Sequence, residues 1–178
     1  MEDRRNFPRW YALYTRPRFE KKVEVTLQTK GLESYVPLHT VLRRWSDRWK
    51  KIEEPLFSCY VFVRIPLSER ICAVQTDGVV RMVSFNGTPS PIPDEEINAF
   101  KNILERTDSF ETTQYLAIGN RVEVIRGPFK GMRGLLIEHR GRKRLLVGIE
   151  QIRQAISVEI SEFDVCPVAD KNADARAA

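Results

Sequence analysis

The sequence has little of what catalysis and metal binding require. Its 178 residues include only two histidines, His39 and His139, and three cysteines, Cys59, Cys72 and Cys166. Neither histidine stands in a motif with a nucleophile, and no His, Cys or carboxylate spacing fits a metal site. An odd number of cysteines without paired spacing is typical of a reducing cytoplasm and argues against a disulfide scaffold. We therefore expect a cytoplasmic protein that is not an enzyme and holds no metal or cofactor.

Long apolar segments are also missing. No apolar run approaches the roughly 18 residues that a membrane span needs, and no apolar segment of a signal peptide follows the polar start from Met1 to Arg9. The glycine-rich segment from Gly127 to Gly134 looks like a phosphate loop, but it lacks Gly-Lys-Ser/Thr and no helix is predicted after it. Neither a membrane protein nor an enzyme with a Walker-type phosphate loop is expected.

What the sequence does have is an uneven distribution of charge. Its 29 Lys and Arg residues outnumber its 24 Asp and Glu residues, which gives a net charge of +5. Residues 1–52 carry 13 basic and 6 acidic side chains (+7), residues 53–118 carry 5 and 10 (−5), and residues 119–178 carry 11 and 8 (+3). A basic N-terminal third fits attraction to phosphate on one face. A solvated Lys/Arg surface is the alternative explanation.

Alternating strand and helix patterns predict a compact α/β domain in the first 106 residues. The expected elements are a strand at 10–14, a helix with Thr15 as N-cap that ends before Gly31, a strand at 33–38, a basic hairpin at 40–54, a strand at 56–65, a short helix that ends at Gly78, a strand at 79–85 and a helix from Pro93. The strand at 56–65 is apolar on both faces, which predicts that both faces are covered.

From Gly119 onward the sequence consists of short β-branched or leucine-rich segments separated by glycines. The predicted strands are 121–125, 134–138, 145–149, 155–160 and 164–168. This density of strands predicts a small closed β-barrel, and the glycines disfavour a helical alternative. The predicted organisation is therefore an α+β protein with a first domain at 8–106, a linker at 107–118, a barrel at 119–168 and a disordered tail at 169–178.

Basic side chains form the first candidate binding set. They are Arg16, Arg18, Lys21 and Lys22 near the start of the first helix, and Arg43, Arg44 and Arg48 in the hairpin. The start of a helix attracts phosphate through its free backbone N–H groups. In the hairpin, Trp45 and Trp49 add stacking surfaces, a combination that suits single-stranded nucleic acid. The alternative is that the two tryptophans cover the sheet beneath the hairpin.

Aromatic side chains form the second candidate set. Tyr14, Phe57, Tyr60 and Phe62 come from two strands that we expect to be neighbours. They could be ordinary core residues. An uncovered apolar patch, however, is typical of a protein interface. Because the strand at 56–65 is apolar on both faces, one of these faces could form such a patch.

Several segments resemble a known family. Trp10–Tyr14, Pro55–Val63 and Gly78–Val80 resemble the N-terminal domain of NusG-type transcription elongation factors, and Gly119–Val124 with Gly127–Gly134 resembles the KOW motif that follows that domain. The similarity runs from about Trp10 to Val168. Further details resemble the specialised UpxY-like antiterminators, which are related to RfaH and associated with capsular polysaccharide operons. They are Trp45–Arg48, Val83–Gly87 and Pro91–Glu95.

The resemblance implies an N-terminal α/β sandwich with a mainly antiparallel sheet and an SH3-like C-terminal barrel. It implies a monomer that binds RNA polymerase across the cleft and suppresses pausing and termination. The aromatic set would take the clamp helices of the largest subunit. Arg16 and Lys22 match basic positions of the family that reach the non-template DNA strand, and Arg18 and Lys21 join them by proximity. Asp77 stands where the RfaH branch has a DNA-contacting arginine.

The barrel of housekeeping members contacts ribosomal protein S10 or Rho, and Ile152 is the apolar candidate for such a contact here. Two other functions stay open at this point. One is a housekeeping NusG-type factor that acts with Rho or S10, and the other is a ribosome-associated, RNA-binding KOW protein.

Overall fold

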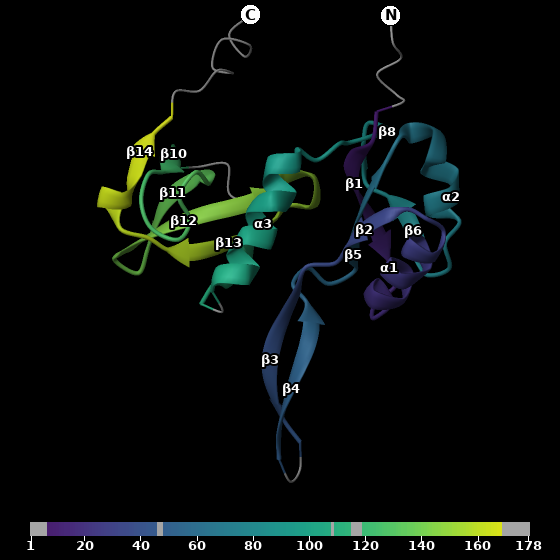
Figure 1. Cartoon of the computed structure of the whole chain (residues 1–178), viewed down its shortest axis with the longest axis horizontal. Coiled ribbons are helices and arrows are strands. Elements are labelled where there is room, and N and C mark those ends of the chain that lie inside the picture. The colour runs from purple at the N-terminus through teal and green to yellow at the C-terminus, as the bar shows by residue number, and fades with distance from the viewer. Residues whose placement is uncertain (1–6, 46–47, 108, 115–118, 169–178) are drawn as a thin grey trace, which may run out of the picture. The chain divides into compact units, whose positions relative to one another are not determined.

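The computed structural model describes residues 7–45, 48–107, 109–114 and 119–168. The chain divides into two compact units, one that ends at Leu104 and one that begins at Glu105 (Figure 1). Helices and strands alternate in the first unit, and antiparallel strands dominate the second, so the predicted α+β class is confirmed. The predicted tail at 169–178 lies outside the described residues.

A four-stranded antiparallel sheet forms the centre of the first unit, in the order β2-β5-β1-β6. Its strands are β1 (Arg9–Thr15), β2 (Glu33–Tyr35), β5 (Tyr60–Ile65) and β6 (Val79–Met82). Strand β1 lies between two neighbours and is buried from Trp10 to Leu13. Both faces of the sheet are therefore covered at this strand, as expected of a strand with apolar residues on both sides.

One face of this sheet packs against helices and carries an aliphatic core. The helices of the unit are α1 (Glu20–Thr29), α2 (Arg70–Val74), which follows a 3-10 helix at Leu67–Glu69, and α3 (Asp94–Arg106). Leu13 of β1 and Val63 of β5 share this core with Val23 and Leu27 of α1 and with Ala73 of α2. The spacing of four residues between Val23 and Leu27 places both on one side of α1.

Helix α1 begins later than predicted. Thr15 lies in β1 and donates its backbone N–H to the carbonyl oxygen of Cys59 (2.9 Å), so it does not cap the helix. The helix begins at Glu20, and Phe19 at the N-cap position makes no side-chain capping bond. At the other end, Gly31 has φ 78°, the left-handed conformation expected for the glycine that follows a helix.

The strand predicted at 56–65 begins only at Tyr60, because residues 56–59 form a turn. Cys59 adopts a left-handed φ of 66° in this turn. The carboxylate of Glu20, which is 4% exposed, accepts the Cys59 N–H at 2.6 Å and so stabilises the unusual backbone conformation. Because this partner lies far away in the sequence, the local apolar pattern predicted one continuous strand at 56–65.

The strand predicted at 79–85 is likewise interrupted. β6 ends at Met82, and a separate strand, β7 (Ser84–Phe85), pairs with β8 (Thr88–Pro89). Asn86 and Gly87 connect the two, with both residues at positive φ.

Strands β3 (Leu38–Arg44) and β4 (Trp49–Pro55) form an antiparallel hairpin that extends away from the four-stranded sheet (Figure 1). Its register pairs Arg44 with Trp49. Beyond this pair, the Trp45 N–H donates to the Arg48 carbonyl oxygen at 2.8 Å. The hairpin predicted at 40–54 is confirmed, and residues 46 and 47, between its two strands, lie outside the described part of the chain.

The second unit contains one antiparallel sheet in the order β14-β10-β11-β12-β13-β9. Its strands are β9 (Glu111–Gln114), β10 (Asn120–Val124), β11 (Arg133–His139), β12 (Arg142–Ile149), β13 (Gln154–Glu159) and β14 (Val165–Pro167), with 3-10 helices at Glu150–Ile152 and Glu162–Asp164. Leu145, Ile149 and Ile156 are fully buried. Strands β10 to β14 occupy the five positions predicted from the sequence.

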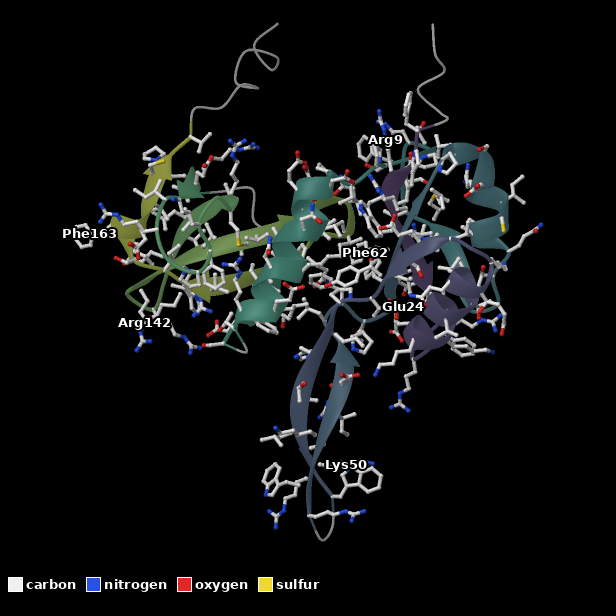
Figure 2. The ribbon with its side chains drawn as sticks, viewed as in Figure 1. Arg9, Glu24, Lys50, Phe62, Arg142 and Phe163 are labelled. Carbon is white, nitrogen blue, oxygen red and sulfur yellow. The ribbon has the colours of Figure 1, made fainter. Side chains whose placement is uncertain are left out.

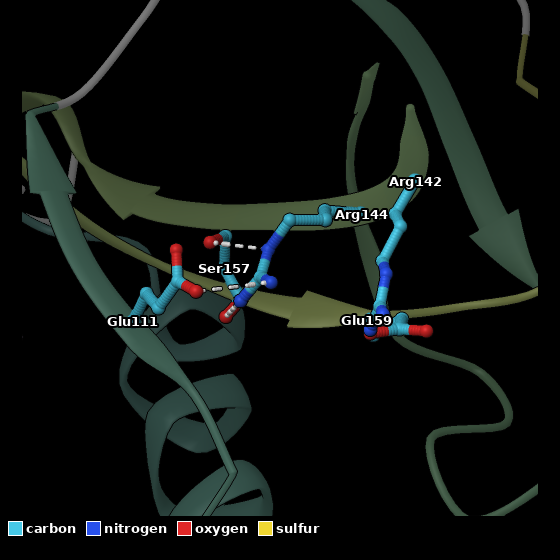
Figure 3. Close-up of polar contacts among 5 residues, drawn as sticks. All are labelled: Glu111, Arg142, Arg144, Ser157 and Glu159. Carbon is cyan, nitrogen blue, oxygen red and sulfur yellow. Dashed lines mark hydrogen bonds and ion pairs between the residues drawn. The ribbon is translucent and has the colours of Figure 1, made fainter. Parts of the chain in front are cut away.

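Strand β9 was not predicted, because it lies in the segment 107–118 that we expected to be a linker. It pairs with β13, with Glu111 opposite Ser157. Its residues are polar and lack apolar alternation, so the pairing rests on backbone hydrogen bonds and on an ion pair between Glu111 and Arg144 at 3.3 Å (Figure 3). Residues 108 and 115–118 of the expected linker lie outside the described residues.

Among the described residues, no helix combines the length and apolar character of a membrane span. The same residues include no group of three or more His, Cys, Asp or Glu side chains placed to hold a metal ion.

Candidate functional site

Aromatic side chains gather on the face of the first sheet opposite the aliphatic core. Tyr14 of β1 and Tyr60 of β5 are direct cross-strand partners, and their ring centroids lie 5.5 Å apart at an angle of 66°. Phe62 lies two residues after Tyr60 and therefore on the same face of β5, and Phe57 from the preceding turn meets it edge to face at 6.4 Å. The structure therefore brings together all four members of the predicted aromatic set, which we call the aromatic cluster.

The members of the aromatic cluster differ in exposure. Phe57 is 2% exposed and Phe62 is 0% exposed, whereas Tyr14 and Tyr60 are half-buried. Helix α3 contributes to the cover, because the ring of Phe100 packs edge to face on Phe57 at 5.2 Å. The tyrosines are thus the members that a partner could contact, and the phenylalanines support them. The sequence predicted a helix in this segment, but not that Phe100 would cover the phenylalanines of the aromatic cluster.

An arginine that the sequence did not single out joins the aromatic cluster. Arg81 of β6 is the cross-strand partner of Tyr14, and its guanidinium lies 5.4 Å from the centre of that ring. Burial raises the pKa of Tyr60, and the positive charge of Arg81 opposes this shift. The Tyr60 hydroxyl is therefore protonated at neutral pH and can donate a hydrogen bond to a partner. Only the β1–β6 register reveals the contribution of Arg81.

Arg16 and Lys22, the two predicted DNA-contacting residues that match basic positions of the family, lie beside the same ring and the same carboxylate. Both are within cation–π distance of the Phe19 ring, at 5.9 and 5.1 Å. Both also contact Asp77, with N–O distances of 3.9 Å for Arg16 and 2.8 Å for Lys22. The hydrogen bond from Lys22, with a smaller effect of Arg16, lowers the pKa of Asp77, which is therefore ionised. A phosphate that binds here has to compete with this carboxylate.

Arg18 and Lys21 differ from that pair. The Lys21 ammonium donates to the Glu53 carbonyl oxygen at 2.9 Å and lies 3.7 Å from its carboxylate, which connects α1 to the base of the hairpin. Arg18 is exposed and has a left-handed φ of 65°. Phosphate attraction by the N–H groups of α1 is weakened by Glu20, whose carboxylate stands in the first turn of that helix.

In the hairpin, Arg43 forms two hydrogen bonds to the Glu54 carboxylate, each 3.0 Å long. Arg44 and Arg48 are exposed near the end of the hairpin. Trp45 and Trp49 are 53% and 66% exposed, so they do not cover the sheet, and that alternative reading of the hairpin is wrong.

Ile152, the predicted partner contact of the second unit, is 5% exposed. It lies at the end of the 3-10 helix after β12, and Arg153, which follows it, has a left-handed φ of 54°. Its side chain packs in the interior of the second unit and offers little surface to a partner.

A family model described as "Transcription termination factor nusG" matches residues 8–101, which is more than half of the chain. The chain belongs to the NusG family. The match covers the unit that contains the aromatic cluster and the hairpin, so membership does not rest on the C-terminal strands alone. NusG is a family of transcription factors, which fits the expectation of a non-enzymatic protein.

Curated NusG relatives are similar over nearly the whole chain. "Transcription termination/antitermination protein NusG" of Streptococcus pyogenes is 28% identical over 173 residues, which cover 86% of this chain and 96% of the relative. The protein with the same description from Vibrio vulnificus is 28% identical over 167 residues, which cover 85% of this chain and 91% of the relative. A solved structure described as "Domain interaction in Thermotoga maritima NusG" aligns with a TM-score of 0.48 and 23% identity, over 91% of this chain and 98% of the other.

Proposed function

We propose that this NusG-family chain is an elongation and antitermination factor that binds RNA polymerase across the cleft and suppresses pausing and termination. The aromatic cluster is the observation that carries the proposal. Tyr14 and Tyr60 are half-exposed over the buried rings of Phe57 and Phe62. Tyrosines held on a rigid apolar base are typical anchors of protein interfaces, because they contribute large area at low entropic cost. Their proposed partner is the clamp helices of the largest polymerase subunit.

The proposed contact with the non-template DNA strand uses Arg16, Arg18, Lys21 and Lys22. Of these, Arg18 has no ion-pair partner among the described residues, whereas Asp77 occupies Arg16 and Lys22. Binding of a phosphate would replace one anionic partner of these two cations by another. This contact should therefore be weak and sensitive to salt, and polymerase binding should supply most of the affinity.

The proposed mechanism is a shift between polymerase states. A protein that bridges the two sides of the cleft binds most tightly to the conformation in which those sides have the correct separation. Such binding favours the active state over the opened states that pauses require, by the ratio of its affinities for the two.

We further propose a specialised role at a long operon, of the polysaccharide-biosynthesis type, rather than a general one. Support comes from the three segments that resemble UpxY-like antiterminators, two of which contain the hairpin end and the β7–β8 turn. The burial of Ile152 also leaves the second unit without its one predicted contact to S10 or Rho. A housekeeping role with Rho or S10 is the outcome that would replace this proposal.

The polymerase contact can be tested with a double variant, Tyr14→Ala with Tyr60→Ala. Removal of two aromatic anchors should weaken binding to purified core polymerase at least about tenfold in Kd. The matched control is Phe85→Ala, because Phe85 lies in the same unit, is 76% exposed and is outside the aromatic cluster. Substitutions of Phe57 and Phe62 are less suitable, because both are buried and their loss would destabilise the fold. An unchanged Kd in the double variant would show that the proposed site is wrong.

The specialised role can be tested by transcription in vitro with and without Rho. The wild type should increase read-through at pause and termination sites, and the double variant should not. Enhanced Rho-dependent termination by the wild type would instead identify a housekeeping factor.

A further inference from the structure

The end of the β3–β4 hairpin carries tryptophans on both of its faces. We call the residues Arg43, Arg44, Trp45, Arg48, Trp49, Lys50 and Lys51 the hairpin tip. Side chains alternate between faces along a strand, and cross-strand partners share a face. Arg43 pairs with Lys50, and the backbone bond from Trp45 to Arg48 continues this pairing. Trp45, two residues after Arg43, therefore lies on the same face as Arg43 and Lys50. The pairing of Arg44 with Trp49 places Trp49 on the other.

Both indoles are accessible and neither contributes to the core, since Trp45 is 53% and Trp49 is 66% exposed. The Lys50 ammonium lies 5.3 Å from the centre of the Trp45 ring, so a cation accompanies this indole on its own face (Figure 2). On the opposite face, Trp49 is accompanied by Arg44 and Lys51. Each face of the hairpin tip therefore combines one aromatic surface with positive charge.

Among the described residues, most of this positive charge has no acidic partner. Glu54 matches Arg43 with two hydrogen bonds. By contrast, Arg44, Arg48, Lys50 and Lys51 form no ion pair with any residue that the structure describes. Two exposed indoles stand among cations that have no ion-pair partner in the described part of the hairpin. Such an arrangement is costly at a surface without a ligand, because the like charges repel one another and the rings remain in water.

The two opposed faces decide which class of ligand fits. A protein partner offers one continuous surface and would cover one indole while the other stayed exposed. A base-paired duplex stacks its own bases and has no free ring face to offer. A single strand has free bases and phosphates and is flexible enough to contact both faces of a two-stranded hairpin.

We propose that the hairpin tip binds single-stranded nucleic acid, with one base stacked on Trp45, another on Trp49, and the backbone phosphates held by Arg44, Arg48, Lys50 and Lys51. The site lies outside the aromatic cluster and requires no polymerase. It therefore does not depend on the proposed polymerase contact.

Intrinsic fluorescence gives a direct assay. The chain has three tryptophans, and the third, Trp10, is 4% exposed. A base that stacks on an indole quenches its emission, so quenching will report mainly on the hairpin tip. Titration of the full chain with dT20 should quench the emission, with an affinity that falls between 50 and 200 mM salt. A 20-base-pair duplex should bind more weakly at the same salt. A parallel titration with U20 shows whether RNA binds as well as DNA.

Variants then assign the binding to the indoles, with the anisotropy of labelled dT20 as the measurement. The double variant Trp45→Ala with Trp49→Ala should lose about 25-fold or more in affinity, because each stacked base contributes about a fivefold factor or more. The matched variant Trp45→Phe with Trp49→Phe keeps an aromatic ring at each position and should retain most of the affinity. Phe163→Ala removes an exposed aromatic residue of the second unit and should change nothing.

Three results would overturn the proposal: equal affinity of the alanine variant and the wild type, equal affinity for the duplex and the single strand, or absence of quenching by both dT20 and U20. An alanine variant that keeps its affinity for dT20 but loses affinity for polymerase would reassign the hairpin tip to a protein contact. The Tyr14→Ala, Tyr60→Ala variant should bind dT20 like the wild type, which separates this proposal from the polymerase contact.

Discussion

Two arginines of β12 make similar contacts in different surroundings, and the comparison predicts how burial changes their contribution to stability (Figure 3). The Arg142 side chain is 68% exposed and pairs with Glu159 at 2.9 Å. The Arg144 side chain is 10% exposed and pairs with Glu111 at 3.3 Å. Arg144 also donates to the Ser157 hydroxyl at 3.0 Å and to the Ser157 carbonyl oxygen at 2.9 Å. Both arginines lie on the same face of one strand, so each is the natural control for the other.

The expected magnitudes differ accordingly. A hydrogen bond from a charged group contributes about 1.5–3 kcal/mol. Since the two bonds of Arg144 share one guanidinium, we expect Arg144→Ala to cost about 2–4 kcal/mol. The ion pair with half-exposed Glu111 adds at most about 1 kcal/mol, and Arg142→Ala should cost no more than about 0.5 kcal/mol. In a small domain, 1 kcal/mol lowers Tm by about 4–8 °C, so Arg144→Ala should lower the Tm of the second unit by roughly 10–30 °C.

The measurement is thermal unfolding of the full chain by calorimetry, with hydrogen exchange of the β12 and β13 amides to assign the loss to the second unit. Glu111→Gln separates the ion pair from the two hydrogen bonds and should cost less than about 1 kcal/mol. Equal costs for Arg142→Ala and Arg144→Ala would refute the reasoning. A cost of Glu111→Gln as large as that of Arg144→Ala would show that the ion pair, and not the bonds to Ser157, carries the stability.

Other predictions concern Asp77, Gly134 and Phe100. Because Lys22 and Arg16 lower the folded pKa of Asp77, its stabilising effect is present above the unfolded pKa of about 3.9 and is lost as the pH falls through the lower folded value. In urea melts between about pH 5 and pH 2, the wild type should therefore lose more stability than Asp77→Asn, and parallel curves would contradict this assignment. Gly134→Ala would place a Cβ 2.5 Å from the Leu146 carbonyl oxygen, so it should destabilise the second unit by about 1–3 kcal/mol in a thermal melt. An unchanged melt would mean that β11 can shift to make room for the methyl group. Phe100→Ala removes a ring that is 1% exposed and packs on Phe57, so it should lower the free energy of unfolding by about 3–5 kcal/mol in denaturant melts. A decrease below about 1 kcal/mol would show that α3 does not hold the aromatic cluster in place.

Elements with local signals were predictable from the sequence. The strands of the second unit and the β3–β4 hairpin were found because alternation and turn residues act over a few positions. The turn at 56–59 was missed because its left-handed Cys59 depends on Glu20, a partner in α1. Strand β9 was missed because a polar edge strand has no apolar period, and its pairing depends on β13.

Some features of the candidate site were likewise predictable from the sequence, and others were not. The positions of the aromatic cluster could be named from the sequence, since two apolar strands supply them. Their exposure could not, because Phe100 of α3 covers the phenylalanines and leaves the tyrosines half-exposed. The basic residues could be listed, but the pairing of Arg16 and Lys22 with Asp77 could not, because it joins elements that are distant along the chain.

The amino-acid sequence by itself determined the split of charge along the chain, the order of most elements, the two candidate sets and the resemblance to the NusG family. These properties depend on residue type and on spacing within a few residues. Only the tertiary structure decided which aromatic rings a partner can reach, which cations are already paired, and that Trp45 and Trp49 face opposite ways. Exposure and pairing depend on contacts between distant segments and on strand register, and a local sequence pattern specifies neither.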